Sequence, residues 1–382
     1  MTEGRHRVYR TRRLQRSPEV YALQDLGWSD FFANQVEAGS DDAVPARIAE
    51  ENRELYRIFC AQGEFLAELS GKLRHATTSR ADLPAAGDWV LAQPRLREHR
   101  ATIHRVLARK GKFSRKIAGR KTEEQILAAN VDVVFLVSSL NRDFNPRRIE
   151  RYLTLAWDSG ARPVIVLNKS DLCENAADLR AQAEDAALGA RVILTSATRG
   201  DGLAELRAVL QPGLTAALLG SSGVGKSSLI NAILGATFGD TASEPLATQA
   251  VRATDDKGRH TTTTRQLILV PSGGVLIDTP GMRELQLWDA SEGIARAFTD
   301  IQELAASCKF RDCRHKNEPG CAVRAAVSTN AIDPERLENF HKLEREEQFL
   351  EAKQDAALRS QRTKDLRKLM KSVNQFYKHR GR

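Results

Sequence analysis

The chain of 382 residues contains no apolar run close to the 18 or so residues that a membrane-spanning helix requires, although 41% of its residues are hydrophobic. Residues 1–16 are rich in arginine and lack the apolar stretch of a secretory signal. Five cysteines are too few for a disulfide framework in a chain of this length. These absences predict a protein of the reducing cytoplasm with no membrane segment.

Negative charge is also in deficit, with 49 acidic residues against 58 lysines and arginines, which gives a net charge of +9. An excess of positive charge favours a polyanionic partner without identifying it. At roughly one domain per 150 residues, the length predicts two to three domains.

The stretch 215–235, TAALLGSSGVGKSSLINAILG, carries the strongest signal. An apolar run, a glycine-rich turn and a helix-forming segment follow one another, and in this context GxxxxGK followed by Ser or Thr indicates a phosphate-binding loop. Its glycines let backbone N–H groups face an anion, to which the helix start adds its positive end. We expect Lys226 to reach the outer phosphates and the Ser227 hydroxyl to ligate Mg²⁺. A chance glycine turn is the alternative. The predicted nucleotide-binding residues of the loop are Gly220, Ser221, Ser222, Gly223, Val224, Gly225, Lys226, Ser227 and Ser228.

The tetrapeptide 168–171, NKSD, follows an apolar strand, where α/β proteins bind ligands. The Asp171 carboxylate can accept hydrogen bonds from the N1–H and the exocyclic amine of guanine, and adenine offers no such pair. Alone the tetrapeptide is weak evidence for a base-binding site, since a solvated loop can have the same sequence. With TSA at 195–197 and the phosphate loop further on, it indicates a guanine nucleotide and argues against a P-loop ATPase. The predicted base-binding residues are Asn168, Lys169, Ser170, Asp171, Ser196 and Ala197.

The sequence DTPG follows the strand-like run GGVLI. Asp278 suits a water-mediated Mg²⁺ contact and the Gly281 N–H can sense a γ-phosphate, while a plain turn is the alternative. One threonine of GRHTTTT, residues 258–264, is expected as a second Mg²⁺ ligand. Met282 stands where Ras-like GTPases place a water-orienting glutamine. We therefore predict His260 as the catalytic group that positions the water, against the alternative of a loop histidine with no such role.

The rest of the first half predicts two architectures. Residues 44–108 hold five short apolar or alternating segments with polar breaks, which is typical of a small β-barrel of the OB type, with basic residues nearby that favour RNA contact. Residues 111–130 read as a basic connector. From residue 131 strands alternate with helices, which predicts a parallel sheet covered by helices. Residues 1–40 predict a solvated basic extension, with a nucleic-acid-binding arm as the alternative.

Near the end, C-x4-C-x-H-x5-C is formed by Cys308, Cys313, His315 and Cys321. Three thiolates and an imidazole predict a closed tetrahedral zinc site with a structural role, and chance proximity of buried cysteines is the alternative. A long helix follows, and the basic tail 351–382 suggests contact with RNA phosphates unless it is only a solvated helix or a frayed end.

The motif order NKSD, TSA, GSSGVGKSS, GRHTTTT, DTPG is a circular permutation of the Ras-like order, which is tolerable because domain termini often lie close together. With the five-strand segment before it and the cysteine cluster after it, the chain resembles the bacterial ribosome-assembly GTPases of the RsgA (YjeQ) family over roughly residues 44–350. The stretches FSRKIAGRKTEEQILAANVDVVFLV and GRHTTT match that family's wording closely.

The resemblance implies binding to the small (30S) ribosomal subunit and its rRNA late in subunit maturation, with GTP hydrolysis stimulated by the subunit. The expected cofactors are GTP or GDP, Mg²⁺ and one structural Zn²⁺ held by the cysteine–histidine set. A monomer is expected. An RNA-binding assembly factor that uses GTP only as a conformational ligand is the alternative.

We accordingly predict a multidomain protein. The expected parts are a basic extension at 1–43, an OB-fold RNA-binding domain at 44–113, a circularly permuted α/β P-loop GTPase domain at 114–290, and a zinc-binding, mainly helical domain with a basic tail at 291–382.

Overall fold

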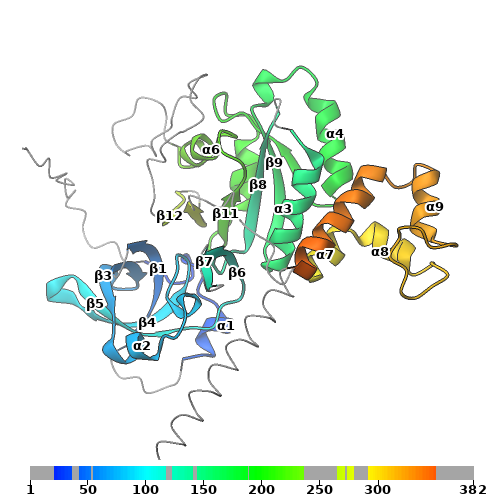
Figure 1. The fold of residues 1–382 in the computed structure, drawn as a ribbon. Helices are drawn as coiled ribbons and strands as arrows, with labels where there is room; N and C mark the ends of the chain where they lie inside the picture. Colours follow the sequence, from blue (N-terminus) through cyan, green and yellow to red (C-terminus); the bar gives the residue numbers. More distant parts are fainter. Residues whose placement is uncertain are drawn as a thin grey trace, which may run out of the picture.

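The computed structural model describes residues 21–36, 43–52, 55–117, 123–140, 144–187, 189–235, 265–271, 273–278 and 291–349. Figure 1 shows a small barrel at one end, a central sheet with its helices, and a helical module beside that sheet. Within the described ranges, no helix is long and apolar enough to cross a membrane.

Five strands close into a barrel in the order β1-β2-β3-β5-β4, with β4 pairing back onto β1. Only β3 and β5 run parallel within it. Along β3, buried and exposed residues alternate because every second side chain points into the barrel. The predicted OB-type barrel is confirmed. Its elements are β1 (Val44–Asn52), β2 (Leu55–Cys60), β3 (Gly63–Leu69), α2 (Gly71–Ala76), η1 (Arg80–Asp82), β4 (Trp89–Arg95), η2 (Leu96–Glu98) and β5 (Arg100–Val106).

The segment before the barrel packs against it, so the expected solvated extension is wrong for residues 21–36. Here α1 (Asp30–Ala33) buries Phe32, and the Trp28 ring meets Trp89 of β4 edge-on with centroids 4.7 Å apart. The aromatic residues gave no periodicity that could reveal this partner. The arginines of residues 5–16 lie outside the described part of the chain.

The expected basic connector is a β-hairpin of β6 (Lys112–Ile117) and β7 (Glu123–Ala129). The apolar side chains of Phe113 and Leu127 are buried in the core that also contains residues of α3 (Pro146–Asp158), which is why this segment folds as strands. Its positive charge is partly paired, since Lys112 Nζ lies 2.8 Å from a Glu124 carboxylate oxygen.

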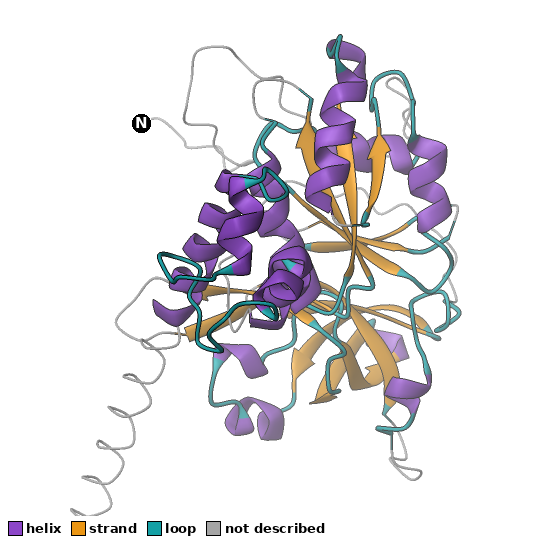
Figure 2. Cartoon of the chain, turned by 90° about the vertical axis from the view of Figure 1, so that its right-hand side faces the viewer, coloured by secondary structure: helices purple, strands orange, loops and turns teal. Residues whose placement is uncertain are grey.

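The central sheet has the order β10-β9-β8-β11-β13-β12, parallel except for β12. Strand β12 also pairs with β1 of the barrel, so one continuous sheet joins both parts. Figure 2 shows helices packed along the sheet, with the barrel below. The elements are β8 (Val133–Ser139), α3 (Pro146–Asp158), β9 (Arg162–Asn168), η3 (Ser170–Leu172), α4 (Ala176–Ala187), β10 (Arg191–Leu194), α5 (Leu203–Val209), β11 (Thr215–Leu219), α6 (Lys226–Ile233), β12 (Gln266–Leu269) and β13 (Val275–Asp278).

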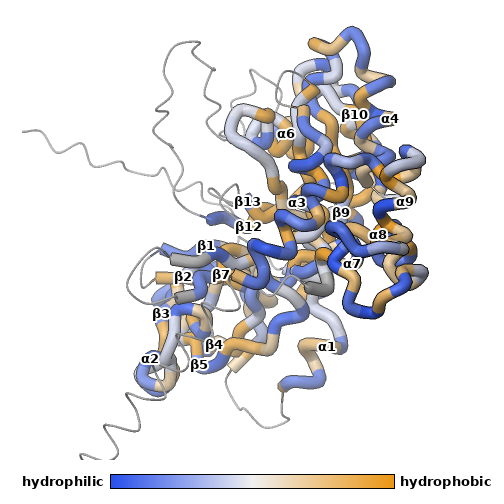
Figure 3. Tube along the Cα trace, turned by 45° about the vertical axis from the view of Figure 1, so that its right-hand side comes forward, coloured by the Kyte–Doolittle hydropathy of each residue, from blue (hydrophilic) through white to orange (hydrophobic). Residues whose placement is uncertain are grey.

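Successive residues of the buried strands face opposite cores. In β8, Val134 and Leu136 pack in the core that contains α3 and α4, whereas Phe135 and Val137 pack in the core that contains α5 and α6. This alternation explains why the strands read as continuous apolar runs. Figure 3 shows central strands that are largely hydrophobic and outer helices of mixed character.

The C-terminal module shares the first of these cores. Its Phe298, Ile301 and Phe340 lie in one cluster with Leu153 of α3. The module therefore depends on the sheet for part of its hydrophobic burial. It consists of α7 (Ser291–Ala297), α8 (Thr299–Ala305), α9 (Ala322–Ser328) and a helix over residues 334–349.

Candidate nucleotide and metal sites

The phosphate loop, residues 220–227, connects the end of β11 to the start of α6. Gly225 caps α6 with φ of 95°, and a Cβ there would lie 2.4 Å from Asn168 Nδ2. A Cβ on Gly220 would lie 2.3 Å from the carbonyl oxygen of Val137 in β8. Both positions therefore favour glycine, Gly220 because the backbone of β8 lies too close for a side chain, and Gly225 because its φ is positive and the Asn168 amide occupies the space.

Lys226 turns back over this loop. Its Nζ donates hydrogen bonds to the carbonyl oxygens of Gly220 and Ser221, at 2.7 Å each. Asp278 ends β13, the strand next to β11. Burial raises the pKa of Asp278, and the positive charge of Lys226 opposes that shift. A lysine and a partly buried carboxylate thus share one edge of the sheet.

The NKSD tetrapeptide holds the phosphate loop from the side. The Asn168 amide Nδ2 donates to the carbonyl oxygen of Val224 at 2.9 Å, and its Oδ1 accepts from the Ala197 N–H at 3.3 Å. Lys169 Nζ donates to the carbonyl oxygen of Gly223 at 2.7 Å. The structure therefore joins three sequence motifs, NKSD, TSA and the phosphate loop, through direct hydrogen bonds.

Asp171 stands at the outer edge of this cluster. A hydrogen bond from the Ser196 hydroxyl is the largest influence that lowers the pKa of Asp171, and the Thr198 hydroxyl adds to it. Thr198 Oγ1 lies 3.3 Å from Asp171 Oδ2. The carboxylate is therefore ionised at neutral pH and able to accept further donors.

Of the residues predicted from sequence, Asn168 to Asp171, Ser196, Ala197, the phosphate loop and Asp278 gather at the carboxyl ends of the parallel strands. His260, Gly281, the GRHTTTT threonines and Met282 lie outside the described residues.

Sequence reasoning missed Thr198 and Arg148. Arg148, on α3, donates from Nη1 to the Ser221 hydroxyl at 3.0 Å. The sequence shows Arg148 as part of a basic pair just after a helix cap. Its contact with the phosphate loop depends on β8 lying beside β11, and the sequence does not predict that pairing.

The four residues of the C-terminal cluster come together. Their ligand atoms lie within 4.8 Å of one another, with His315 Nδ1 3.6 Å from Cys308 Sγ and 3.4 Å from Cys321 Sγ. The Sγ atoms of Cys308 and Cys321 are 3.9 Å apart. A zinc tetrahedron with its usual bond lengths has edges of about 3.6 Å between S and N and about 3.8 Å between two S atoms. The set could therefore hold a metal ion of that size.

The cluster is built by local backbone. Cys321 caps α9, and its Sγ accepts from the Arg324 N–H at 3.4 Å. His315 has φ of 56°, a left-handed conformation that directs its ring Nδ1 to the sulfur atoms. Cys60 and Cys173 take no part in the cluster.

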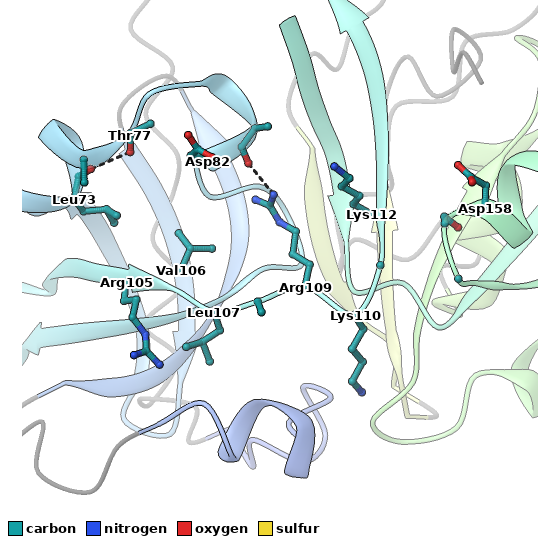
Figure 4. A pocket seen from close by; sticks show the side chains of 16 residues that line it. Leu73, Thr77, Asp82, Arg105, Val106, Leu107, Arg109, Lys110, Lys112 and Asp158 are labelled. Atoms are coloured by element: carbon teal, nitrogen blue, oxygen red, sulfur yellow. Dashed lines mark hydrogen bonds between the residues drawn. The ribbon is translucent and has the colours of Figure 1, made fainter. Parts of the chain in front are cut away.

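A cleft of about 720 Å³ lies apart from both sites, between the barrel and the end of α3 (Figure 4). Its cationic side chains already have partners. Arg109 donates to both carboxylate oxygens of Asp88, Arg105 donates to the Gln35 carbonyl, and Lys110 lies 5.1 Å from the centre of the Phe32 ring. These contacts hold residues 105–110 against the barrel and α1 and give no indication of an anion site.

Comparison with known proteins identifies relatives over nearly the whole chain. The family model described as RsgA GTPase matches residues 106–288. The chain is 47% identical over 348 residues to the small ribosomal subunit biogenesis GTPase RsgA of Opitutus terrae, covering 88% of this chain and 92% of that protein. It is 45% identical over 329 residues to the protein of the same name from Mesorhizobium japonicum, covering 86% and 90%.

Solved structures agree on the fold. The crystal structure of YjeQ from Thermotoga maritima superposes with a TM-score of 0.59 at 30% identity and covers 79% of this chain and 97% of that one. YloQ, described as a circularly permuted GTPase, gives 0.56 at 23% identity, with coverage of 84% and 98%. The fold of this chain is therefore shared with solved proteins.

Proposed function

The chain belongs to the RsgA GTPase family and is a GTPase that uses a guanine nucleotide, and on this premise we propose that it acts on the small ribosomal subunit. It binds that 30S subunit and its rRNA late in maturation and hydrolyses GTP to GDP and phosphate, with the subunit stimulating hydrolysis. The names of its relatives, which describe small ribosomal subunit biogenesis, support the subunit as partner.

One observation carries the nucleotide part of the proposal. Asn168 and Lys169 bond directly to carbonyl oxygens of the phosphate loop, so Asp171, which suits guanine, stands beside a loop that suits phosphates. The base contacts are assigned to Asn168, Lys169, Ser170, Asp171, Ser196 and Ala197, and the phosphate contacts to residues 220–228 and Gly281.

Both metals fit the residues that would hold them. Mg²⁺ would be ligated by the Ser227 hydroxyl and contacted through water by Asp278, whose burial disfavours an isolated charge and so suits a cation nearby. Bound there, Mg²⁺ neutralises phosphate charge. One Zn²⁺ would be held by Cys308, Cys313 and Cys321 with His315, closing a segment with little core of its own.

The remaining assignments concern the whole protein. The barrel and the basic tail are the parts assigned to rRNA, and a cytoplasmic monomer is expected. The division at residues 43, 113 and 290 is kept as the domain proposal, with residues 21–36 added to the barrel on which they pack and with the hairpin of β6 and β7 left undivided. Turnover of GTP and of ATP, each with and without purified small subunits, tests the function. GTP turnover that subunits accelerate supports it, whereas subunit binding with no turnover favours the conformational-ligand alternative.

His260 is the proposed group that positions the attacking water. We expect His260→Ala to leave nucleotide and subunit affinity near normal while most of the subunit stimulation, ~10³–10⁵ in comparable partner-completed sites, disappears. Single-turnover hydrolysis with saturating subunits measures this. An unaffected rate in His260→Ala would assign the water to backbone or rRNA groups.

Nucleotide state should control subunit affinity. A γ-phosphate that holds Gly281 acts ten residues before α7, and the module that α7 begins shares its core with α3. We expect a non-hydrolysable GTP analogue to tighten small-subunit binding relative to GDP by ~1–3 kcal/mol, and subunits to tighten the analogue equally by linkage. Equilibrium binding at one fixed salt concentration measures both directions. Equal affinities of the two nucleotide forms would favour a passive binding protein.

A further inference from the structure

The first turn of α3 contacts two parts of the molecule that are distant in sequence. Asn145 caps this helix, and its side-chain oxygen accepts from the N–H groups of Arg147 and Arg148 at 2.9 and 3.3 Å. The cap fixes the direction of the turn. In Figure 1, α3 lies between the central strands and α7.

On one side, the turn reaches the phosphate loop at Ser221. The Ser221 hydroxyl accepts from Arg148 Nη1 at 3.0 Å, and the Ser221 carbonyl accepts from Lys226 Nζ at 2.7 Å. Asn168 and Lys169 bond to two later carbonyls of the same loop. Arg148 therefore fastens the beginning of the loop, as the NKSD residues fasten its middle.

On the other side, the turn is joined to the C-terminal module through a buried carboxylate. Glu150 is fully buried and accepts from Arg147 Nη1 of its own helix at 2.5 Å, and from two groups of the module, Arg336 Nη1 at 2.7 Å and Asn339 Nδ2 at 2.6 Å. Arg336 also makes two hydrogen bonds to Asp300, at 2.8 Å each, and its guanidinium lies 4.7 Å from the centre of the Phe298 ring.

A buried carboxylate deprived of these donors would be strongly unfavourable. A shift of the module against α3 would leave Glu150 with Arg147 as its remaining partner among the described residues, which favours movement of Glu150 together with the module. Because Glu150 lies on the same helical turn as Arg148, such a shift would also move the hydrogen bond to Ser221.

We propose that Arg148 is a positioning residue for the phosphate loop, through which the docking of the C-terminal module on α3 sets the rate of GTP turnover. The inference rests on the proposed function, since it takes residues 220–227 as the phosphate-binding loop. Arg148 acts through Ser221 and not on the nucleotide. Its loss should therefore misplace the loop at the reacting phosphate and lower kcat more than it raises KM.

The test uses the full chain with Arg148→Gln, Ser221→Ala and the double variant. Each single change is expected to lower kcat about tenfold with KM within about twofold. The loss in the double variant should be smaller than the product of the two single losses, because both changes remove the hydrogen bond between Arg148 and Ser221. Arg148→Lys, which keeps a charged donor, should restore part of the rate.

Arg180→Gln is the control. Arg180 lies on α4 and makes an ion pair with Glu184 of the same helix at 2.7 Å, so the change removes a guanidinium without altering the contacts of the phosphate loop or those between α3 and the C-terminal module. It should leave kcat unchanged.

A further variant tests the link to the module. Asn339→Ala removes one donor to Glu150 and leaves the Arg336 pair in place. It should lower kcat about threefold in the wild-type background and have no further effect in Arg148→Gln.

Normal kcat in both Arg148→Gln and Ser221→Ala, or an equal loss in Arg180→Gln, would overturn the positioning role. Should Arg148→Gln fail to fold, Ser221→Ala still decides. Wild-type protein without GTP turnover would instead contradict the proposed function, so the two failures are distinguishable.

Discussion

Asp171→Asn is expected to weaken GTP and GDP binding by about 3–5 kcal/mol. The ionised carboxylate can accept from both the N1–H and the amine of guanine, and the Ser196 and Thr198 hydroxyls hold the pKa of Asp171 below its ordinary value. The asparagine retains one acceptor and turns an amide N–H toward the other guanine donor. Two donors then face each other without a partner.

Xanthine has a carbonyl where guanine has its amine, so the variant should bind XDP better than GDP. Calorimetric titration of wild type and variant with GDP and XDP measures this exchange of preference. Asp178→Asn makes the same charge change on an exposed position of α4 and should leave both affinities unchanged. Unaltered GDP affinity in Asp171→Asn would remove the NKSD segment from the nucleotide site.

Cys313→Ser is expected to lower bound zinc well below one ion per chain and to unfold the segment around residues 306–330. Metal binding at sites of this kind contributes to the free energy of folding. The apparent binding free energy of zinc is about 10–16 kcal/mol in zinc-finger peptides. Helices α7 and α8 should stay packed because Ile294, Phe298 and Ile301 lie in the core beside α3. GDP affinity should therefore survive.

Metal analysis together with hydrogen exchange over residues 300–349 separates these outcomes. Cys173→Ser removes a thiol outside the cluster and should change neither the zinc content nor the exchange. Treatment of wild type with a chelator should reproduce the effect of Cys313→Ser. Persistent protection of residues 306–330 without bound metal would show the site to be incidental to folding.

Much of the candidate site could be predicted from sequence because its signals are local. A phosphate loop needs glycines at fixed spacing between a strand and a helix, and residues 215–235 contain that whole pattern. The Cys308–Cys321 spacing is equally compact, and the four ligand atoms do meet. The barrel strands could be predicted because apolar and polar residues alternate along segments such as β3, where buried and exposed positions alternate in the structure.

Other features could not be predicted because they depend on which segments become neighbours. The positive charge of residues 111–130 led us to predict a connector. The burial of Phe113 and Leu127 could not be predicted, because it depends on the core that they share with α3. Trp28 packs on Trp89, which lies sixty-one positions further along the chain. No sequence pattern between the two residues predicts that they come into contact.

The sequence by itself determined the chemistry: which residues suit guanine, phosphate and zinc, and in what permuted order they come, because those signals lie within short stretches. Only the tertiary structure decided how these groups are connected. The contact between Arg148 and Ser221 exists because β8 lies beside β11, and the one between Glu150 and Arg336 exists because the C-terminal module docks on α3. Both join residues far apart in sequence, and packing free energy summed over the whole core selects such pairs, which no local pattern records.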